Sequence, residues 1–343
     1  MNNFVGLDVS QNITSICVVD DAGKRIWRGQ CASRPDDIER VVRKQAGEEA
    51  RIGIETGPMT PWLVHELRRL GLDLICLDAR HAKAALRMQL NKTDESDAEG
   101  LAHIVRTGWY RSVHVKSYAA HRARALLGAR AQLVGMTTRL SNHIRGVLKI
   151  FGLLPGGMHG LPFAARVETL LADRPDVMPI VSPMLIAWRQ LRAQITSFDK
   201  AVHALVKNNP DCRLLMTVPG IGALSVLAYV SAVEDPERFR RSRSVGAHLG
   251  LTPRQYQSGE IDRSGRISRC GDALTRTLLY EAAVVVLCRV KRSSPLKDWA
   301  LAIAKRSGAG KARIALARKL SAILHSVWRS RVPFCWVKEA ASA

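Results

Sequence analysis

The sequence lacks the features that mark membrane, exported and disulfide-bonded proteins. It has no run of about 18 apolar residues, so no segment is expected to span a membrane. Its first ten residues contain no basic stretch followed by an apolar run, so we expect no signal peptide and a cytoplasmic location. The seven cysteines are scattered and include no Cys-x-x-Cys pair, which favours small buried side chains in a reducing compartment over a metal or redox site.

Acidic residues are scarce beyond residue 100. The 343-residue chain has 52 Lys and Arg against 30 Asp and Glu, but its first 100 residues hold 14 and 16 of these, so the net charge of +22 arises entirely from the rest. Such a surplus favours a nucleic-acid partner, because basic side chains release counterions from phosphates. The alternatives are a generally basic surface or a membrane-surface binder, but the charges alternate with glycine turns and do not form one amphipathic helix.

The first third of the chain predicts an α/β domain over residues 1–112. Its pattern indicates a three-stranded meander followed by alternating helices and strands, in the order 4–9, 14–19, 25–30, helix 35–45, strand 51–55, helix 60–70 and strand 72–77. This order resembles the RNase H-like arrangement, which sugar kinases and actin share. A further helix is expected over 96–108, with Ser96 as its N-cap and Glu99 as the capping-box partner.

The rest of the chain predicts a helical arm and a mostly α C-terminal domain. Apolar residues at roughly heptad spacing over 118–151 and 184–206 indicate two long helices in an antiparallel coiled-coil arm, within a domain at 113–209. The Gly- and Pro-rich stretch 152–182 is expected to be an irregular loop. The arm is either a spacer or a dimerisation surface. Residues 210–343 form the third predicted domain, which ends in a basic helical tail over 297–324.

Four acids occupy positions typical of a metal-dependent phosphoryl-transfer site. Asp8 and Glu55 close the first and fourth strands, which lie side by side in such a sheet, and the small residues around them are expected to admit a phosphate. Asp94 and Asp97, spaced i, i+3 at a helix start, share one face. Each acid alone has a structural explanation as a turn residue or cap. Together they form the oxygen-rich patch that Mg²⁺, or Mn²⁺, requires.

Two features of the C-terminal third indicate DNA contacts. Val218-Pro219-Gly220-Ile221-Gly222, between two helical runs, predicts a helix-hairpin-helix that grips DNA phosphates through backbone N–H groups, with an ordinary tight turn as the alternative. Ser258 stands before a glycine among arginines that could steady a phosphodiester under attack, although such serines are common in turns. The predicted DNA-binding residues are Pro219, Gly220, Gly222, Arg240, Arg241, Arg243, Arg254, Arg263 and Arg266.

The motifs and their order together resemble a known family. Val5-Gly6-Leu7-Asp8-Val9-Ser10, Ile54-Glu55-Thr56-Gly57, Asn91-Lys92-Thr93-Asp94-Glu95-Ser96-Asp97-Ala98, the hairpin motif at 218–222 and Gly250-Leu251-Thr252-Pro253-Arg254-Gln255-Tyr256-Gln257-Ser258-Gly259 are similar to those of the DEDD transposases of the insertion-sequence IS-110 group. These are relatives of the Piv/MooV DNA invertases and include bridge-RNA-guided recombinases.

The resemblance implies a specific mechanism and set of partners. Asp8, Glu55, Asp94 and Asp97 would hold Mg²⁺ in a RuvC-like domain, and Ser258 would be the nucleophile that forms a covalent phosphoserine link to DNA. Donor and target double-stranded DNA and a structured guide RNA would be the nucleic-acid partners. Homodimers would pair into a homotetramer in which the carboxylates of one protomer meet the serine of another. We expect such a bacterial protein to associate with the nucleoid when it acts.

Three other functions fit parts of the sequence. A sugar kinase needs a phosphate loop directly after the first acid, where Val9-Ser10-Gln11 stands instead, and has no use for a basic second half. A junction-resolving nuclease would cut DNA with water at the four acids and leave Ser258 structural. A DNA-binding protein with a degenerate active site would not be expected to keep all four acids.

Overall fold

The structure is a computed structural model that describes residues 2–87 and 93–336. Its contacts divide the chain into two compact units, Met1–Ser117 and Tyr118–Ala343. The boundary lies beyond the predicted domain end at 112 because the backbone N–H of Val113 donates to the carbonyl of Cys76 at 2.8 Å, which ties this segment to the sheet. The second unit contains both the predicted arm and the predicted C-terminal domain, and their division by function remains a prediction.

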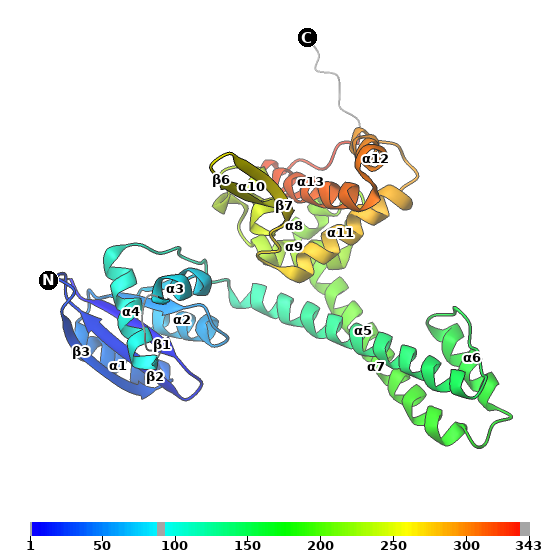
Figure 1. Cartoon of the computed structure of the whole chain (residues 1–343), viewed down its shortest axis with the longest axis horizontal. Coiled ribbons are helices and arrows are strands. Elements are labelled where there is room, and N and C mark those ends of the chain that lie inside the picture. Colours follow the sequence, from blue (N-terminus) through cyan, green and yellow to red (C-terminus); the bar gives the residue numbers. More distant parts are fainter. Residues whose placement is uncertain (1, 88–92, 337–343) are drawn as a thin grey trace, which may run out of the picture. The chain divides into compact units, whose positions relative to one another are not determined.

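The first unit is an α/β domain with the predicted order of elements (Figure 1). Its sheet has the strand order β3-β2-β1-β4-β5, in which β1 pairs antiparallel with β2 and parallel with β4. The pairing of β2 with β3 is antiparallel and that of β4 with β5 parallel. The elements are β1 Phe4–Val9, β2 Ile13–Val19, β3 Arg25–Ala32, α1 Pro35–Ala46, β4 Arg51–Glu55, α2 Thr60–Arg69, β5 Leu74–Leu77, α3 Ala79–Leu86 and α4 Asp94–Thr107.

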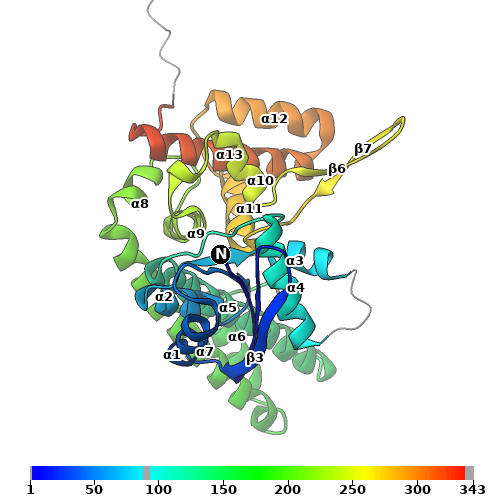
Figure 2. The ribbon, with the colours of Figure 1, turned by 90° about the vertical axis from the view of Figure 1, so that its left-hand side faces the viewer.

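The first unit has three layers, with helices on both faces of the sheet, and the side chains of β1 point alternately into the two cores. Val5 and Leu7 pack with α1 and α2 in one core, whereas Phe4 packs with α4 in the other. Figure 2 shows α1 and α2 on one side of this unit and α3 and α4 on the other. Because successive side chains of a strand point to opposite faces, even-numbered residues of β1 face α4. Asp8, the acid near the end of β1, therefore lies on the face of the sheet that α4 covers.

The second unit pairs two long helices, α5 Tyr118–Ile150 and α7 Met178–Lys207, along each other. Leu127 near the start of α5 shares a core with Val202 near the end of α7, and Leu148 near the end of α5 shares another with Val181. The helices are therefore antiparallel, as predicted, while coiled-coil packing of their side chains remains a prediction.

The stretch 152–182 is not the irregular loop that the sequence predicted. It contains helix α6 Leu161–Leu171 and the first turns of α7, which begins at Met178. The prolines misled the prediction, because Pro162 and Pro179 lie in the first turn of their helices, where the missing N–H removes no helical hydrogen bond. Helix α6 lies beside the ends of α5 and α7 (Figure 1). Its Phe163 is buried in a core shared with residues of both helices.

The C-terminal part of the second unit is helical around its own core, with one exception. A two-stranded antiparallel hairpin, β6 and β7, interrupts a domain that was expected to be mostly α, and the predicted basic tail is divided between two helices. The elements are α8 Pro210–Leu215, α9 Ala223–Val233, the 3-10 helix η1 Pro236–Arg238, α10 Ser242–His248, β6 Pro253–Ser258, β7 Ile261–Ile267, α11 Ala273–Cys288, α12 Pro295–Ser307 and α13 Ala309–Ser330.

The cysteines are only partly the buried side chains that were expected. Cys17, Cys76 and Cys212 are buried, and burial raises the pKa of their thiols to about 11, 11 and 12. Cys288 and Cys335 are exposed instead. Within the described residues, no helix combines the length and apolar character that a membrane span requires.

Candidate active site and nucleic-acid interface

Asp8 and Glu55 stand side by side at one edge of the sheet. Leu7 of β1 pairs in parallel register with Ile54 of β4, so the next residue on each strand is the acid. Both side chains are half-buried. The carboxyl ends of these adjacent parallel strands thus bring the two predicted ligands together, as the sequence indicated.

The glycines that precede these acids make room for a helix. A Cβ on Gly6 would lie 2.0 Å from the Ala98 carbonyl oxygen of α4, and one on Gly53 would lie 2.3 Å from Val105 of the same helix. The expectation that these glycines leave room for a phosphate is therefore wrong, because α4 fills that space. By strand alternation, Asp8 lies on the same face of the sheet as Gly6, the face that α4 covers.

The first turn of α4 lies toward the acidic edge. Near the other end of the helix, Arg106 donates at 3.2 Å to the carbonyl of Asp21, which itself lies beside the start of β1 through a 3.1 Å bond from Asn2. Helix α4 therefore runs antiparallel to β1, and its first turn, with Asp94 exposed and Asp97 half-buried, lies toward the Asp8 end. The structure thus gathers the four predicted acids at one end of the first unit.

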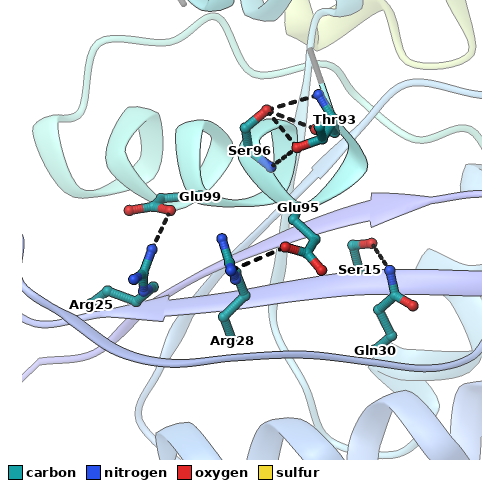
Figure 3. A network of polar contacts seen from close by, with 8 residues as sticks. All are labelled: Ser15, Arg25, Arg28, Gln30, Thr93, Glu95, Ser96 and Glu99. Carbon is teal, nitrogen blue, oxygen red and sulfur yellow. Dashed lines mark hydrogen bonds and ion pairs between the residues drawn. The ribbon is translucent and has the colours of Figure 1, made fainter. Parts of the chain in front are cut away.

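The neighbouring acids Glu95 and Glu99 form ion pairs with arginines of β3. Glu95 forms an ion pair with Arg28 at 3.1 Å and Glu99 with Arg25 at 3.0 Å, which ties α4 to β3 (Figure 3).

The N-cap of α4 differs from the prediction. Thr93 is the cap, and its hydroxyl accepts from the backbone of Ser96 at 3.1 Å while the Ser96 hydroxyl accepts from the backbone of Thr93 at 3.0 Å (Figure 3). A Ser-x-x-Glu pattern is typical of a capping box, but here Glu99 is engaged by β3. The earlier start places Asp94 and Asp97 in the first turn.

The acidic edge offers the oxygen ligands that divalent metal ions prefer. Within residues 2–87 and 93–336, however, no three acidic, histidine or cysteine side chains form a ready-made ion-binding group. Asn91 and Lys92 of the preceding motif lie outside the described residues. The donor chemistry of these four acids fits a divalent metal ion.

Ser258 lies at the tip of the β6–β7 hairpin. It pairs with Ile261 across the two-residue turn Gly259-Glu260, and Gly259 has a φ of 56°, which fits a turn with glycine at its first central position. Tyr256 and its cross-strand partner Arg263 lie on the same face of the hairpin as Ser258. The serine is therefore exposed, with an arginine and an aromatic ring beside it.

The base of this hairpin is tightly held although its tip is exposed. A Cβ on Gly250 would lie 2.1 Å from the carbonyl oxygen of Cys270, and one on Gly271 would lie 2.1 Å from that of His248. The guanidinium of Arg276 also donates to the Cys270 carbonyl at 3.2 Å. The sequence prediction did not include this hairpin, and the only signal for it was Gly259 as the first residue of a two-residue turn.

The remaining predicted DNA contacts are partly on the surface. All six arginines of that set, Arg240, Arg241, Arg243, Arg254, Arg263 and Arg266, are exposed. In the 218–222 motif only Gly222 is exposed, at the N-cap of α9, whereas Pro219 is buried. Gly220 has a φ of 79°, and a Cβ there would lie 2.6 Å from the carbonyl oxygen of Ala282 in α11. Packing alone therefore explains Gly220.

Comparisons with known proteins place these sites in a family. A DEDD-type transposase model of the IS110 group matches residues 5–152, and a model described as the transposase IS116/IS110/IS902 family matches residues 212–298. A probable family 20 transposase of Pseudomonas aeruginosa is 30% identical over 329 residues, which cover 93% of this chain and 95% of that protein. The chain belongs to the IS110 transposase family.

Other relatives agree with this assignment. The transposase of an IS1111A element of Coxiella burnetii is 28% identical over 94% of this chain and 88% of its own length. A pilin gene-inverting protein of Moraxella bovis is 29% identical over 149 residues, which cover 41% of this chain and 45% of that protein. As a member of the IS110 family, the chain is an insertion-sequence transposase, an enzyme whose substrate is DNA and whose DEDD-type domain implies a divalent metal ion.

Proposed function

We propose that this transposase cuts and rejoins DNA by transesterification, with Ser258 as the nucleophile and Asp8, Glu55, Asp94 and Asp97 as the metal-binding acids. The observation that carries the proposal is the position of Ser258, exposed at the tip of a basic hairpin whose base is held by close backbone packing. A serine with no other role at a hairpin tip is free to meet a DNA phosphate, and Arg263 on the same face would stabilise the developing charge.

The reaction conserves the number of phosphoester bonds. The Ser258 oxygen attacks phosphorus and loses its proton, the bond from phosphorus to one deoxyribose oxygen breaks, and that oxygen leaves as a hydroxyl. The hydroxyl of another DNA end then attacks the phosphoserine, which releases the serine and regenerates a phosphodiester. Because the energy of the phosphoester is kept in the covalent link, rejoining requires no ATP.

The four acids would hold Mg²⁺, or Mn²⁺, which when bound stabilises charge on the attacked phosphate and favours loss of the serine proton. The exposed arginines around the hairpin and α10 would bind the DNA backbone, and the 218–222 turn would add the N–H groups at the start of α9. Gly222 is the member of that turn with open space around it.

The proposal extends to RNA guidance and to assembly. The basic surplus beyond residue 100 suits polyanion partners, and the family resemblance implies that a structured guide RNA is one of them beside DNA. Exposed apolar side chains near the α6 end of the arm, Ile150, Leu154, Leu161, Ile180 and Ile186, support a dimerisation role, with dimers pairing into a tetramer.

The experiment that tests the mechanism is covalent trapping. Purified protein, with and without its element's RNA, is mixed with labelled donor and target DNA and Mg²⁺ and run on a denaturing gel. We expect a protein–DNA adduct that disappears in Ser258→Ala and in Asp8→Asn. Ser264→Ala is the matched control, because Ser264 pairs with Gln255 on the opposite face of the same exposed hairpin.

A second candidate function is a metal-dependent nuclease that cuts junctions with water. It is favoured by the position of Asp8 and Glu55, which follow paired residues of two parallel strands and need no contribution from Ser258. Cut DNA without an adduct, with Ser258→Ala as active as the parent, would select the nuclease. An adduct that forms equally well without RNA would remove RNA guidance from the proposal and leave the serine mechanism standing.

A further inference from the structure

A polar cavity lies where α6 packs against α5 and α7, in a part of the second unit distant in sequence from Ser258. Its volume is about 130 Å³. The residues that line it are Thr137, Thr138, Ser141, Arg145, His159, Gly160, Phe163, Trp188 and Arg192.

Two arginines of this cavity are held against aromatic rings. The guanidinium of Arg145 lies 4.2 Å from the centroid of Phe163, and that of Arg192 lies 5.5 Å from the centroid of Trp188. The two rings themselves meet edge to face at 5.7 Å. Stacking restricts each planar guanidinium, so less conformational entropy is lost when it binds a ligand.

The positive charge of this cavity is not neutralised from within. No acidic residue lines it, and no described carboxylate forms an ion pair with Arg145 or Arg192. Elsewhere on the arm, by contrast, Arg130 pairs with Asp199 at 2.6 Å and Arg189 with Glu168 at 2.6 Å. Arg145 does donate hydrogen bonds to the backbone carbonyls of Ser141 and Met158, but these partners are uncharged, so the positive charge of the cavity can still be met by an anion from outside.

A buried donor in the wall of this cavity lacks an acceptor among the described residues. Trp188 is only 2% exposed, and its indole N–H has no hydrogen-bond partner among the described residues. An indole N–H can only donate, and leaving such a group unpaired in the interior is unfavourable. Gly160, the N-cap of α6, also lines the cavity and adds the positive end of an 11-residue helix.

We propose that this cavity binds a phosphate group, with Arg145 and Arg192 as its charged donors. A cavity lined by two guanidinium groups and no carboxylate selects an anion, and the planar guanidinium matches the oxygens of phosphate. The phosphate belongs either to a nucleic-acid backbone or to a small phosphate compound. The site is independent of the serine chemistry proposed above.

The test follows the indole N–H signals of the seven tryptophans in the full-length protein by NMR, with that of Trp188 assigned from Trp188→Phe. Inorganic phosphate is titrated in one arm and a single-stranded oligonucleotide in the other. We expect a saturable shift of the Trp188 signal, and binding about tenfold or more weaker in Arg192→Gln, because a charged hydrogen bond is lost. Arg166→Gln, an exposed charge loss on α6 outside the cavity, should bind like the parent.

Each outcome has a definite meaning. A shift with inorganic phosphate that Arg192→Gln weakens identifies a site for small phosphate compounds, and a shift with the oligonucleotide alone identifies a backbone site; both support the proposal. A Trp188 signal that moves with neither probe, or that moves equally in Arg192→Gln and Arg166→Gln, overturns it. Ser258→Ala should bind phosphate normally, so failure of the serine mechanism leaves this result unaffected.

Discussion

The acidic edge of the first unit and the serine hairpin of the second are built in opposite ways. Asp8 and Glu55 end strands that are covered on both faces, and the backbone of β1 touches the backbone of α4 at Gly6. Every residue of β6, and all of β7 but its last, is exposed. The hairpin has a tight base and no core of its own.

This difference indicates a division of labour. Metal-dependent chemistry requires carboxylates in fixed positions, and a packed sheet edge provides them. A two-stranded hairpin is only marginally stable by itself, so its tip can adapt to a substrate. The close backbone packing at Gly250 and Gly271 fixes the position of the hairpin base. Substitutions in the two regions should therefore differ in their effects on cleavage, stability and DNA binding.

The largest effect on activity should come from a substitution at the acidic edge of the first unit. Asp8→Asn should lower strand cleavage by about a thousandfold or more, because it removes a charge needed in the transition state, while the half-buried position keeps the fold. Cleavage assays together with the thermal midpoint measure both. Asp73→Asn, an exposed acid of the same unit, should leave cleavage unchanged. Full cleavage by Asp8→Asn would contradict the site.

A pair of glycine substitutions sharpens the contrast in packing. Gly6→Ala should destabilise the first unit by about 3 kcal/mol, because its Cβ would meet the Ala98 carbonyl at 2.0 Å and force α4 away from the sheet. Gly265→Ala in the hairpin should change stability by less than about 0.5 kcal/mol, since its nearest neighbour is 3.6 Å away. Equal urea midpoints for the two variants would show that α4 is not tightly seated.

The same contrast explains what could be predicted from the sequence. The acidic edge was predictable because buried strands carry strong apolar patterns and parallel register fixes which residues become neighbours, as Leu7 with Ile54 shows. The need for glycine at position 6 was not predictable from the sequence, because only the folded structure shows that the backbone of α4 occupies the space where a side chain would lie. The cap of α4 was misassigned for a related reason, since Arg25 recruits Glu99 from another element.

The hairpin and α6 were missed because their signals are weak or ambiguous. The exposed strands around Gly259 have no buried face, so they show no alternation of apolar and polar residues. In the arm, Pro162 looks like a helix breaker in sequence but starts a helix in the structure. The unpaired Trp188 indole could not have been found without coordinates.

In the exposed hairpin, Arg263→Gln should weaken DNA binding and lower the slope of log affinity against log salt by about one, because one phosphate contact is lost. Titrations at several salt concentrations measure the slope. Asp262→Asn, which alters the neighbouring residue on the opposite face, should not weaken binding. An unchanged slope in Arg263→Gln would place this face of the hairpin away from the DNA backbone.

The smallest effect should come from the base of the hairpin, where Asp272 caps α11 and pairs with Arg124 of α5 at 2.5 Å. Burial alone would raise its pKa, but hydrogen bonds from Thr275 and the charge of Arg124 outweigh burial and hold the pKa below its usual value. A depressed carboxyl pKa stabilises the fold above the unfolded-state pKa of about 3.9, and this contribution is lost as the pH falls through the folded-state value.

Asp272→Asn keeps a side chain that can cap a helix but removes this charge, so it should lower the stability of the second unit by about 1 kcal/mol at neutral pH. The gap from the parent protein should close as the pH is lowered below 4. Urea midpoints measured between pH 3 and 7 test this, with Asp262→Asn in the exposed hairpin as the control. A gap that persists in acid would mean that shape at the hairpin base, and not the ion pair, holds the serine-bearing hairpin in place.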